Sequence, residues 1–310
     1  MIHEYALDPE ALADWPTTRY LLDQFGAQHG RLISRYPNEW KRLVYEACDG
    51  CSPLDKKRIE ERLAGSDNKL VRSGRIFDRA LHWIDNAKRS HNESPFRLII
   101  SNARNASNGI VDAAEIGPDT TGWLPDSGHV ARKAKQLCDA ALPLLIGAKT
   151  ICLVDPHFSC AARHCKPLQQ IVKQVCLHSN AKVISYHLLA KEATAECFEK
   201  KIRGNELKWV RQALRDNQAL GDKAVHFYRW TEREGGEAFH ARYILTDRGG
   251  LLYENGLDEG PDGQTTNVLC MREVDWRLVT KCFDEYEPAY DLTDAWCLSA
   301  NGVSKLPRVS

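Results

Sequence analysis

Three residues in the last third of the chain combine an imidazole, a guanidinium and a carboxylate at close spacing. His240, Arg242 and Asp247 belong to the segment 239–260, FHARYILTDRGGLLYENGLDEG, whose apolar run predicts a strand. Side chains of a strand alternate between its two faces, so His240 and Arg242 project on the same side. Asp247 has the opposite parity and precedes a Gly-Gly turn. The pattern predicts a nucleophilic imidazole beside a phosphate-binding cation, with the carboxylate in a supporting role.

The spacing His-x-Arg-x4-Asp resembles the His-x-Lys-x4-Asp signature of the phospholipase D superfamily. The resemblance implies that His240 attacks phosphorus to form a phosphohistidine, that Arg242 holds a phosphate oxygen, and that a second histidine protonates the leaving group. Arginine keeps the charge of the family's lysine but presents a planar fork instead of an ammonium. The family's Gly-Ser-x-Asn element is echoed by residues 255–258, Asn-Gly-Leu-Asp, which makes Asn255 and Asp258 candidate substrate-binding residues.

Two more polar residues follow a predicted strand upstream of this segment. The run 150–156, TICLVDP, predicts a buried strand, and a helix is predicted over 167–177. Ligands of open α/β sheets bind at the carboxyl ends of strands, so Asp155 and His157 are candidate substrate-binding residues. His157 is a candidate second histidine if one chain builds the whole site. In the alternative interpretation, Asp155 caps the next segment and His157 is a surface turn residue.

A homodimer is the other source of a second histidine. The resemblance implies two motifs per site, whereas the residues after 128 are enough for one ordinary domain. A twofold axis places the same residue of each subunit across from itself, so two copies of His240 would face one phosphate. His187 and His226 lie in strand-like runs and are predicted to be core histidines.

The composition limits the partners and the compartment. The 310 residues include 42 Lys and Arg against 42 Asp and Glu, so no global positive field favours nucleic acid. The acidic N-terminus does not resemble a signal peptide, and the apolar stretch 140–148 is shorter than the ~20 residues that cross a bilayer. Cysteines in apolar runs, such as Cys152, Cys176 and Cys270, predict buried free thiols. These features predict a cytoplasmic protein without a membrane span.

The periodicity divides the chain into three parts. Residues 1–94 are predicted to form a helical N-terminal module, because capping residues precede prolines at Asp8 and Ser52 and apolar residues follow helical spacing over 76–87. Residues 95–128 are predicted to form a strand and a connecting loop. Residues 129–310 alternate helices and strands, which predicts an α/β domain; the resemblance implies a phospholipase D-like mixed sheet flanked by helices. Its predicted helices span 129–148, 167–177, 193–217 and 274–286, and its predicted strands span 151–154, 182–189, 224–230, 240–246, 251–253 and 267–271.

Two clusters contain residue types that bind metals. Cys48 and Cys51 have Cys-x2-Cys spacing. The second cluster consists of His157, Cys160, His164 and Cys165. Neither cluster has a convincing partner pair, so no metal site is predicted. The chemistry that the resemblance implies needs no metal or other cofactor, because the histidine supplies covalent catalysis and the cation stabilises charge.

Three functional hypotheses follow. The first is an intracellular phosphodiesterase that acts on nucleic acid rather than lipid, since the chain shows no membrane-binding helix or lipidation motif. Single-motif proteins of the superfamily resemble nucleases and components of bacterial conflict and antiviral defence systems, which implies a partner ATPase or helicase for residues 1–94. The second is a catalytically inactive adaptor that binds a phosphate. The third is an α/β scaffold in which the motif is a coincidence.

Overall fold

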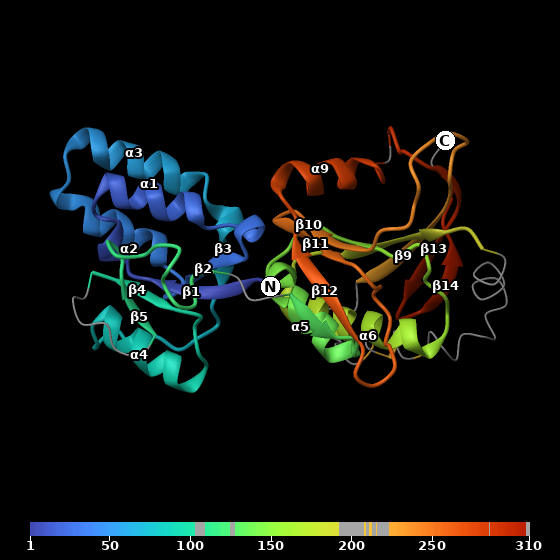
Figure 1. Cartoon of the computed structure of the whole chain (residues 1–310), viewed down its shortest axis with the longest axis horizontal. Coiled ribbons are helices and arrows are strands. Elements are labelled where there is room, and N and C mark those ends of the chain that lie inside the picture. Colours follow the sequence, from blue (N-terminus) through green and yellow to red (C-terminus); the bar gives the residue numbers. More distant parts are fainter. Residues whose placement is uncertain are drawn as a thin grey trace. The chain divides into compact units, whose positions relative to one another are not determined.

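The chain folds into two compact units, Met1–Asp126 and Ser127–Ser310, each built on its own sheet (Figure 1). One sheet is parallel and the other is mixed, and helices flank both, so the fold is α/β as predicted. The computed structural model describes residues 1–102, 109–124, 128–191, 223–284 and 286–307, together with residues 208, 211, 212 and 215.

A five-stranded parallel sheet forms the centre of Met1–Asp126. Its order is β3-β2-β1-β4-β5, and its strands span His3–Leu7 (β1), Arg31–Arg35 (β2), Leu70–Arg72 (β3), Ile99–Ser101 (β4) and Ile110–Asp112 (β5). The helices span Trp15–Gln24 (α1), Trp40–Ala47 (α2), Pro53–Ala64 (α3) and Trp83–Glu93 (α4), and short 3-10 helices span Pro9–Leu12, Ala27–His29, Cys48–Gly50 and Asp67–Lys69. Helices α1 to α3 cover one face of the sheet and α4 covers the other, each over its own apolar core (Figure 1).

The prediction that residues 1–94 form a helical module is not confirmed, because β1, β2 and β3 come from this stretch. These strands are three to five residues long and mostly buried. Short strands covered on both faces lack the alternation that marks a half-buried strand, and their pairing partners are distant in the sequence. The helical spacing over 76–87 is also misleading in its first half, since α4 begins at Trp83.

The helix starts inferred from capping residues are confirmed. The Asp8 carboxylate accepts the backbone N–H of Glu10 at 3.1 Å, and the Ser52 hydroxyl accepts that of Asp55 at 3.2 Å. Each bond satisfies one of the backbone donors that a helix leaves free in its first turn.

A nine-stranded mixed sheet forms the centre of Ser127–Ser310. Its order is β14-β13-β9-β8-β7-β10-β11-β12-β6. The strands span His129–Ala131 (β6), Ile151–Val154 (β7), Val183–Leu189 (β8), Ala224–Thr231 (β9), Tyr243–Thr246 (β10), Gly249–Tyr253 (β11), Thr265–Cys270 (β12), Asp291–Ser299 (β13) and Gly302–Lys305 (β14). Helices α5 (Ala134–Leu145) and α6 (Ala162–His178) lie on one face, and α9 (Glu273–Lys281) lies on the other (Figure 1).

The predicted elements of residues 129–310 are present in the described part, with shifted ends. The predicted helix 129–148 is divided into β6 and α5, and α6 begins already at Ala162 with Pro167 inside it. The predicted strand 240–246 begins at Tyr243, so His240 and Arg242 lie directly before β10. The predicted helix 193–217 falls almost entirely outside the described residues.

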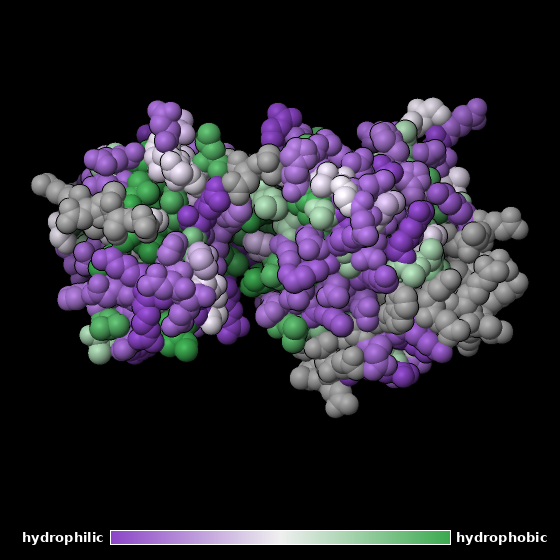
Figure 2. All heavy atoms as spheres, turned by 60° about the horizontal axis from the view of Figure 1, so that its bottom comes forward, coloured by the Kyte–Doolittle hydropathy of each residue, from purple (hydrophilic) through white to green (hydrophobic). Residues whose placement is uncertain are grey.

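The surface and the thiols complete the description. Polar side chains cover most of the face shown in Figure 2, and apolar side chains form smaller patches between them. No helix in the described part of the chain is long and apolar enough to cross a membrane. Cys152, Cys176 and Cys270 are free thiols, as predicted, but only Cys176 is fully buried, whereas Cys152 and Cys270 are partly buried. Burial raises the pKa of Cys152 to about 12. Cys160, in contrast, is disulfide-bonded.

Candidate functional site

The site lies where the carboxyl end of β7 meets the amino end of β10. These strands are antiparallel, and Val154 is paired with Tyr243. The next residue in each direction is therefore Asp155 on one strand and Arg242 on the other. The N–H of Tyr253 donates to the carbonyl of Arg242 at 2.8 Å, which continues the β10–β11 hairpin by one residue. Strand pairing alone thus brings two segments about ninety residues apart in sequence to the same end of two central strands.

Asp155 is the buried acid of this site. Its Oδ1 accepts the backbone N–H of His157 at 3.0 Å, which fixes the turn that follows β7. Burial raises the pKa of Asp155 to about 6, while the N–H of His157 and the nearby Arg242 guanidinium oppose the rise. The carboxylate therefore holds His157 in place and carries negative charge at neutral pH.

His157 is exposed at the same end of these strands, in the field of several cations. Its Nδ1 lies 3.4 Å from Nζ of Lys191, which follows β8. Partial burial lowers the pKa of His157, and the charges of Arg242 and Lys191 lower it further. His240 also acts on His157 in the same direction. The structure thus brings His157 near His240 and Arg242, which belong to a separate segment of the sequence.

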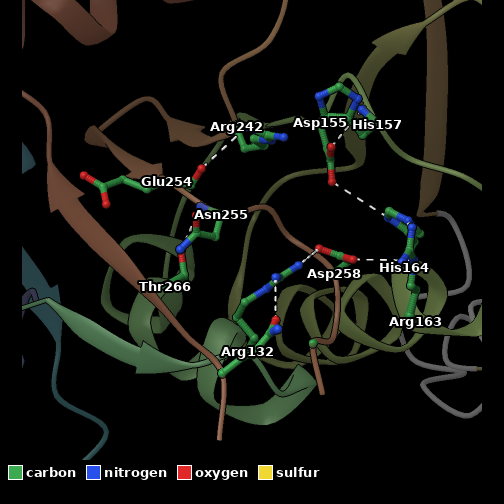
Figure 3. Close-up of polar contacts among 12 residues, drawn as sticks. Arg132, Asp155, His157, Arg163, His164, Arg242, Glu254, Asn255, Asp258 and Thr266 are labelled. Atoms are coloured by element: carbon green, nitrogen blue, oxygen red, sulfur yellow. Dashed lines mark hydrogen bonds and ion pairs between the residues drawn. The ribbon is translucent and has the colours of Figure 1, made fainter. Parts of the chain in front are cut away.

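Arg242 places a guanidinium near Asp155 and His157. Its side chain is half-buried and extends toward Asp155 and His157 (Figure 3). Nη1 lies 3.5 Å from the carbonyl oxygen of Glu254, and Nε is buried without a hydrogen-bond partner among the described residues. His240, two residues earlier, is exposed. The pair has the accessible nucleophile and the adjacent cation that a phosphate ester requires.

Asp258 lies near Asp155 and is paired with two arginines. The Asp258 carboxylate is ion-paired with Arg132, and its Oδ2 lies 3.5 Å from Nε of Arg163 at the start of α6 (Figure 3). Asp258 is itself buried. It therefore fixes the loop after β11 to α6 and to the residue that follows β6, and it is committed to protein contacts.

His164 fills the space between the two acids. Its Nε2 accepts a hydrogen bond from Nε of Arg163 at 3.2 Å, and because arginine can only donate, the proton of the neutral ring is on Nδ1. Burial lowers the pKa of His164 to about 4, so this neutral form dominates at pH 7. Nδ1 faces Oδ2 of Asp155 at 3.9 Å and makes no hydrogen bond among the described residues (Figure 3).

Two of the predicted site residues lie away from His157. The Asn255 side chain donates to the carbonyl of Thr265 at 3.3 Å, and its backbone N–H donates to Thr266, so its contacts fasten the neighbouring hairpin. Asp247 lies at the far end of β10, where its Oδ1 accepts the backbone N–H groups of Lys149 and Thr150. Asp247 thus supports the entry of β7, which matches the supporting role but not a place beside His240.

The histidines predicted to be core residues are in the sheet. His187 is buried, accepts a hydrogen bond from Nε1 of Trp230 at 3.0 Å, and has its pKa lowered to about 3 by burial. His226 is partly buried with its Nδ1 3.4 Å from the Tyr228 hydroxyl. The backbone carbonyl of His187 accepts the N–H of Asp155 at 3.0 Å, so His187 contributes its main chain to the site and keeps its imidazole in the sheet.

Four residues of the site were not predicted from the sequence to belong to it, namely Arg132, Arg163, His164 and Lys191; His164 was considered only as a metal ligand. They come from three places along the chain, since only Arg163 and His164 are adjacent, and no spacing rule relates these places. Among the described residues, no group of three His, Cys, Asp or Glu side chains has the geometry to hold a metal ion. Cys48 and Cys51 are both free thiols.

No protein-family model matches the sequence, and no curated protein matches it.

Proposed function

We propose that Ser127–Ser310 is a metal-independent phosphodiesterase that acts on nucleic acid, with His240 as nucleophile and His157 as general acid. The observation that carries the proposal is the convergence at one end of two central strands of two exposed histidines and the Arg242 guanidinium. The motif that resembles the phospholipase D superfamily supports it. In this arrangement both histidines belong to one chain, so the reaction requires no second subunit.

The proposed reaction has two displacement steps. The His240 imidazole attacks phosphorus and the P–O bond to the leaving group breaks, while His157 protonates the departing oxygen. Arg242 binds the non-bridging oxygens, where negative charge is concentrated. Water, deprotonated by His157, then attacks the phosphohistidine, and the P–N bond breaks to release phosphate monoester and free His240.

A groove next to the site contains three lysines, each of which is ion-paired with a carboxylate, namely Asp262, Asp139 or Glu259. It is lined by Lys133 and Lys135 at the start of α5, by Lys166 and two glutamines of α6, and by Glu259. Glu259 follows Asp258, so the groove begins at the loop that borders the site. Lysines along a groove can contact successive phosphates of a strand, which favours nucleic acid over a small diester. A nuclease of this kind would suit a bacterial defence system, with Met1–Asp126 as the unit that contacts a partner ATPase or helicase.

The first test is hydrolysis of single-stranded DNA, double-stranded DNA and bis(p-nitrophenyl) phosphate in excess EDTA. We expect the wild type to cleave at least one of these and His240→Asn to cleave none, because the nucleophile is lost. His226→Asn is the matched control, since it removes a histidine of the same sheet outside the site. Cleavage that survives in His240→Asn would refute the phosphohistidine route.

The leaving group separates the two histidines. p-Nitrophenolate departs without a proton, whereas the deoxyribose oxygen of DNA needs one. We therefore expect His157→Asn to lose about 10²- to 10⁴-fold in kcat/KM for DNA but to keep most of its kcat/KM for bis(p-nitrophenyl) phosphate, which reports only the first displacement; the second step slows for both substrates. Equal losses on both substrates, measured as kcat/KM, would contradict a general-acid role for His157.

One observation favours a second candidate, the phosphate-binding adaptor. Arg242 replaces the family's lysine, and a guanidinium binds a phosphate bidentately without occupying the position of an ammonium. An adaptor would bind the labelled oligonucleotide and cleave nothing, and Arg242→Ala would abolish that binding. Absence of both cleavage and binding would eliminate the two candidates together.

A further inference from the structure

Lys191 places an ammonium on the side of His157 opposite to Arg242. It follows β8, and the sheet order β8-β7-β10 puts β7 between Lys191 and Arg242. Nζ of Lys191 lies 3.4 Å from Nδ1 of His157, and the Lys191 side chain is exposed. Both cations act electrostatically on His157. His157 is therefore flanked by the ammonium of Lys191, which follows β8, and by the guanidinium of Arg242, which precedes β10.

A buried ion pair fixes the backbone at Lys191. Nη1 of Arg229 donates to the Lys191 carbonyl at 3.2 Å, and the same guanidinium binds both oxygens of Asp294 at 2.8 and 3.0 Å. Nε1 of Trp296 donates to Asp294 as well, at 3.0 Å. Arg229 and Asp294 are both buried, and such pairs lose hydration energy that only good geometry recovers. Here that geometry holds the chain where β8 ends.

We propose that Lys191 is a second phosphate-binding residue of the site, and that Arg229 and Asp294 are its positioning pair. This inference rests on the proposed function. Arg242 clamps one side of the diester with its fork, and Lys191 binds a non-bridging oxygen from the other side as a compact ammonium. The lysine that the motif lacks at position 242 is thereby supplied by a different strand.

The test measures binding of a fluorescein-labelled single-stranded oligonucleotide by anisotropy, in EDTA, across a series of salt concentrations. All variants carry His240→Asn, so that the probe is not cleaved. Lys191→Ala should weaken binding about tenfold, and should reduce the slope of log K against log salt by about 0.7, the value for one lost phosphate contact on a single strand. Lys191→Arg should retain the slope. Lys149→Ala, at the other end of β7, removes an exposed lysine of equal charge and is the control.

The outcomes separate this inference from the proposed function. Loss of slope in Lys191→Ala but not in Lys149→Ala supports the inference. Equal behaviour of these two variants, with binding lost in Arg242→Ala, overturns the role of Lys191 and leaves the proposed function standing. Absence of probe binding in the parent, together with absence of cleavage by the wild type, overturns the proposed function and this inference with it.

The position of Lys191 can be checked without any ligand. The His157 resonance is assigned in the full chain by its loss in His157→Asn, and its pKa is followed by NMR. Because the Lys191 charge lowers the pKa of His157, Lys191→Ala should raise it and Lys149→Ala should leave it unchanged. Asp294→Asn should raise it too if the buried pair positions Lys191. An unchanged pKa in Lys191→Ala overturns the placement.

Discussion

Asp155 and His164 are neighbouring buried groups whose pKa values are shifted so that their contributions to stability oppose each other. Burial raises the pKa of Asp155, so its contribution is fully present below pH 3.8 and is lost as the pH rises through about 6. Burial lowers the pKa of His164, so its contribution is present above pH 6.5 and is lost as the pH falls through about 4. Between pH 4 and 6 the two contributions change in opposite directions.

Replacing one of the two groups removes its contribution, so the pH dependence of the unfolding free energy should then reflect the other group. Relative to the wild type, Asp155→Asn should gain unfolding free energy as the pH rises from 4 to 7, on the order of 2–3 kcal/mol in total, because the shift is about two units. His164→Gln should gain relative to the wild type as the pH falls from 7 to 4. Urea unfolding followed by circular dichroism at four pH values measures both differences. A pH-independent difference would show that the group is not the titrating one.

Local residue types account for part of the candidate site. His240, Arg242, Asp155 and His157 could be named from the sequence, since each follows or precedes an apolar run that forms a strand. Lys191 could not, because an exposed lysine after a strand is ordinary and only the pairing of β8 with β7 gives it meaning. Asn255 was assigned to the site because residues 255–258 resemble a motif of the family. Its side-chain amide instead donates a hydrogen bond to the carbonyl of Thr265 in β12.

At the scale of elements, the loop after β11 depends on the glycine that opens it. Gly256 has φ of +108°, a backbone conformation that residues with a side chain rarely adopt. A Cβ there would lie 2.7 Å from Oδ1 of Asp258. Displacing Asp258 would loosen its ion pairs with Arg132 and Arg163, and so the attachment of this loop to α6.

Two glycine substitutions separate backbone strain from that displacement. Gly263 also has a positive φ, +81°, but a Cβ there would have no heavy atom within 4 Å. We expect Gly263→Ala to lose only about 1 kcal/mol, and Gly256→Ala to lose up to about 3 kcal/mol and to impair oligonucleotide binding. Thermal unfolding and the anisotropy assay provide the two readouts. Equal effects of both substitutions on both readouts would contradict a structural role for the Gly256–Asp258 contact.

The elements also show which parts of the fold sequence patterns can predict. The two strands of the β10–β11 hairpin were predicted because apolar runs flank Gly249 and Gly250, which is a local signal. The turn itself is at Asp247 and Arg248, and both glycines lie in β11. Strands β1, β2 and β3 of the parallel sheet of Met1–Asp126 were not predicted, since they are short and their partners are more than twenty residues away in the sequence. Non-local pairing leaves little trace in a window of ten residues.

At the scale of the whole molecule, the two units have separate sheets and separate cores. Every residue of the candidate site lies in Ser127–Ser310. We therefore expect the fragment 127–310, expressed alone, to bind the oligonucleotide with the same salt slope as the full chain. A folded fragment, verified by circular dichroism, that has lost binding would show that Met1–Asp126 contributes to the site.

The two ends of the His-x-Arg-x4-Asp motif serve different needs. Its histidine and arginine border the site, whereas its aspartate fastens the backbone of Lys149 and Thr150 at the opposite end of β10. Under the proposed function, a descendant of this chain without catalysis would be free to change His240 at once, but a change of Asp247 would still remove two backbone hydrogen bonds. Decay of such a motif should therefore begin at its first residue, and a lone surviving aspartate would mark an inherited strand rather than an inherited reaction.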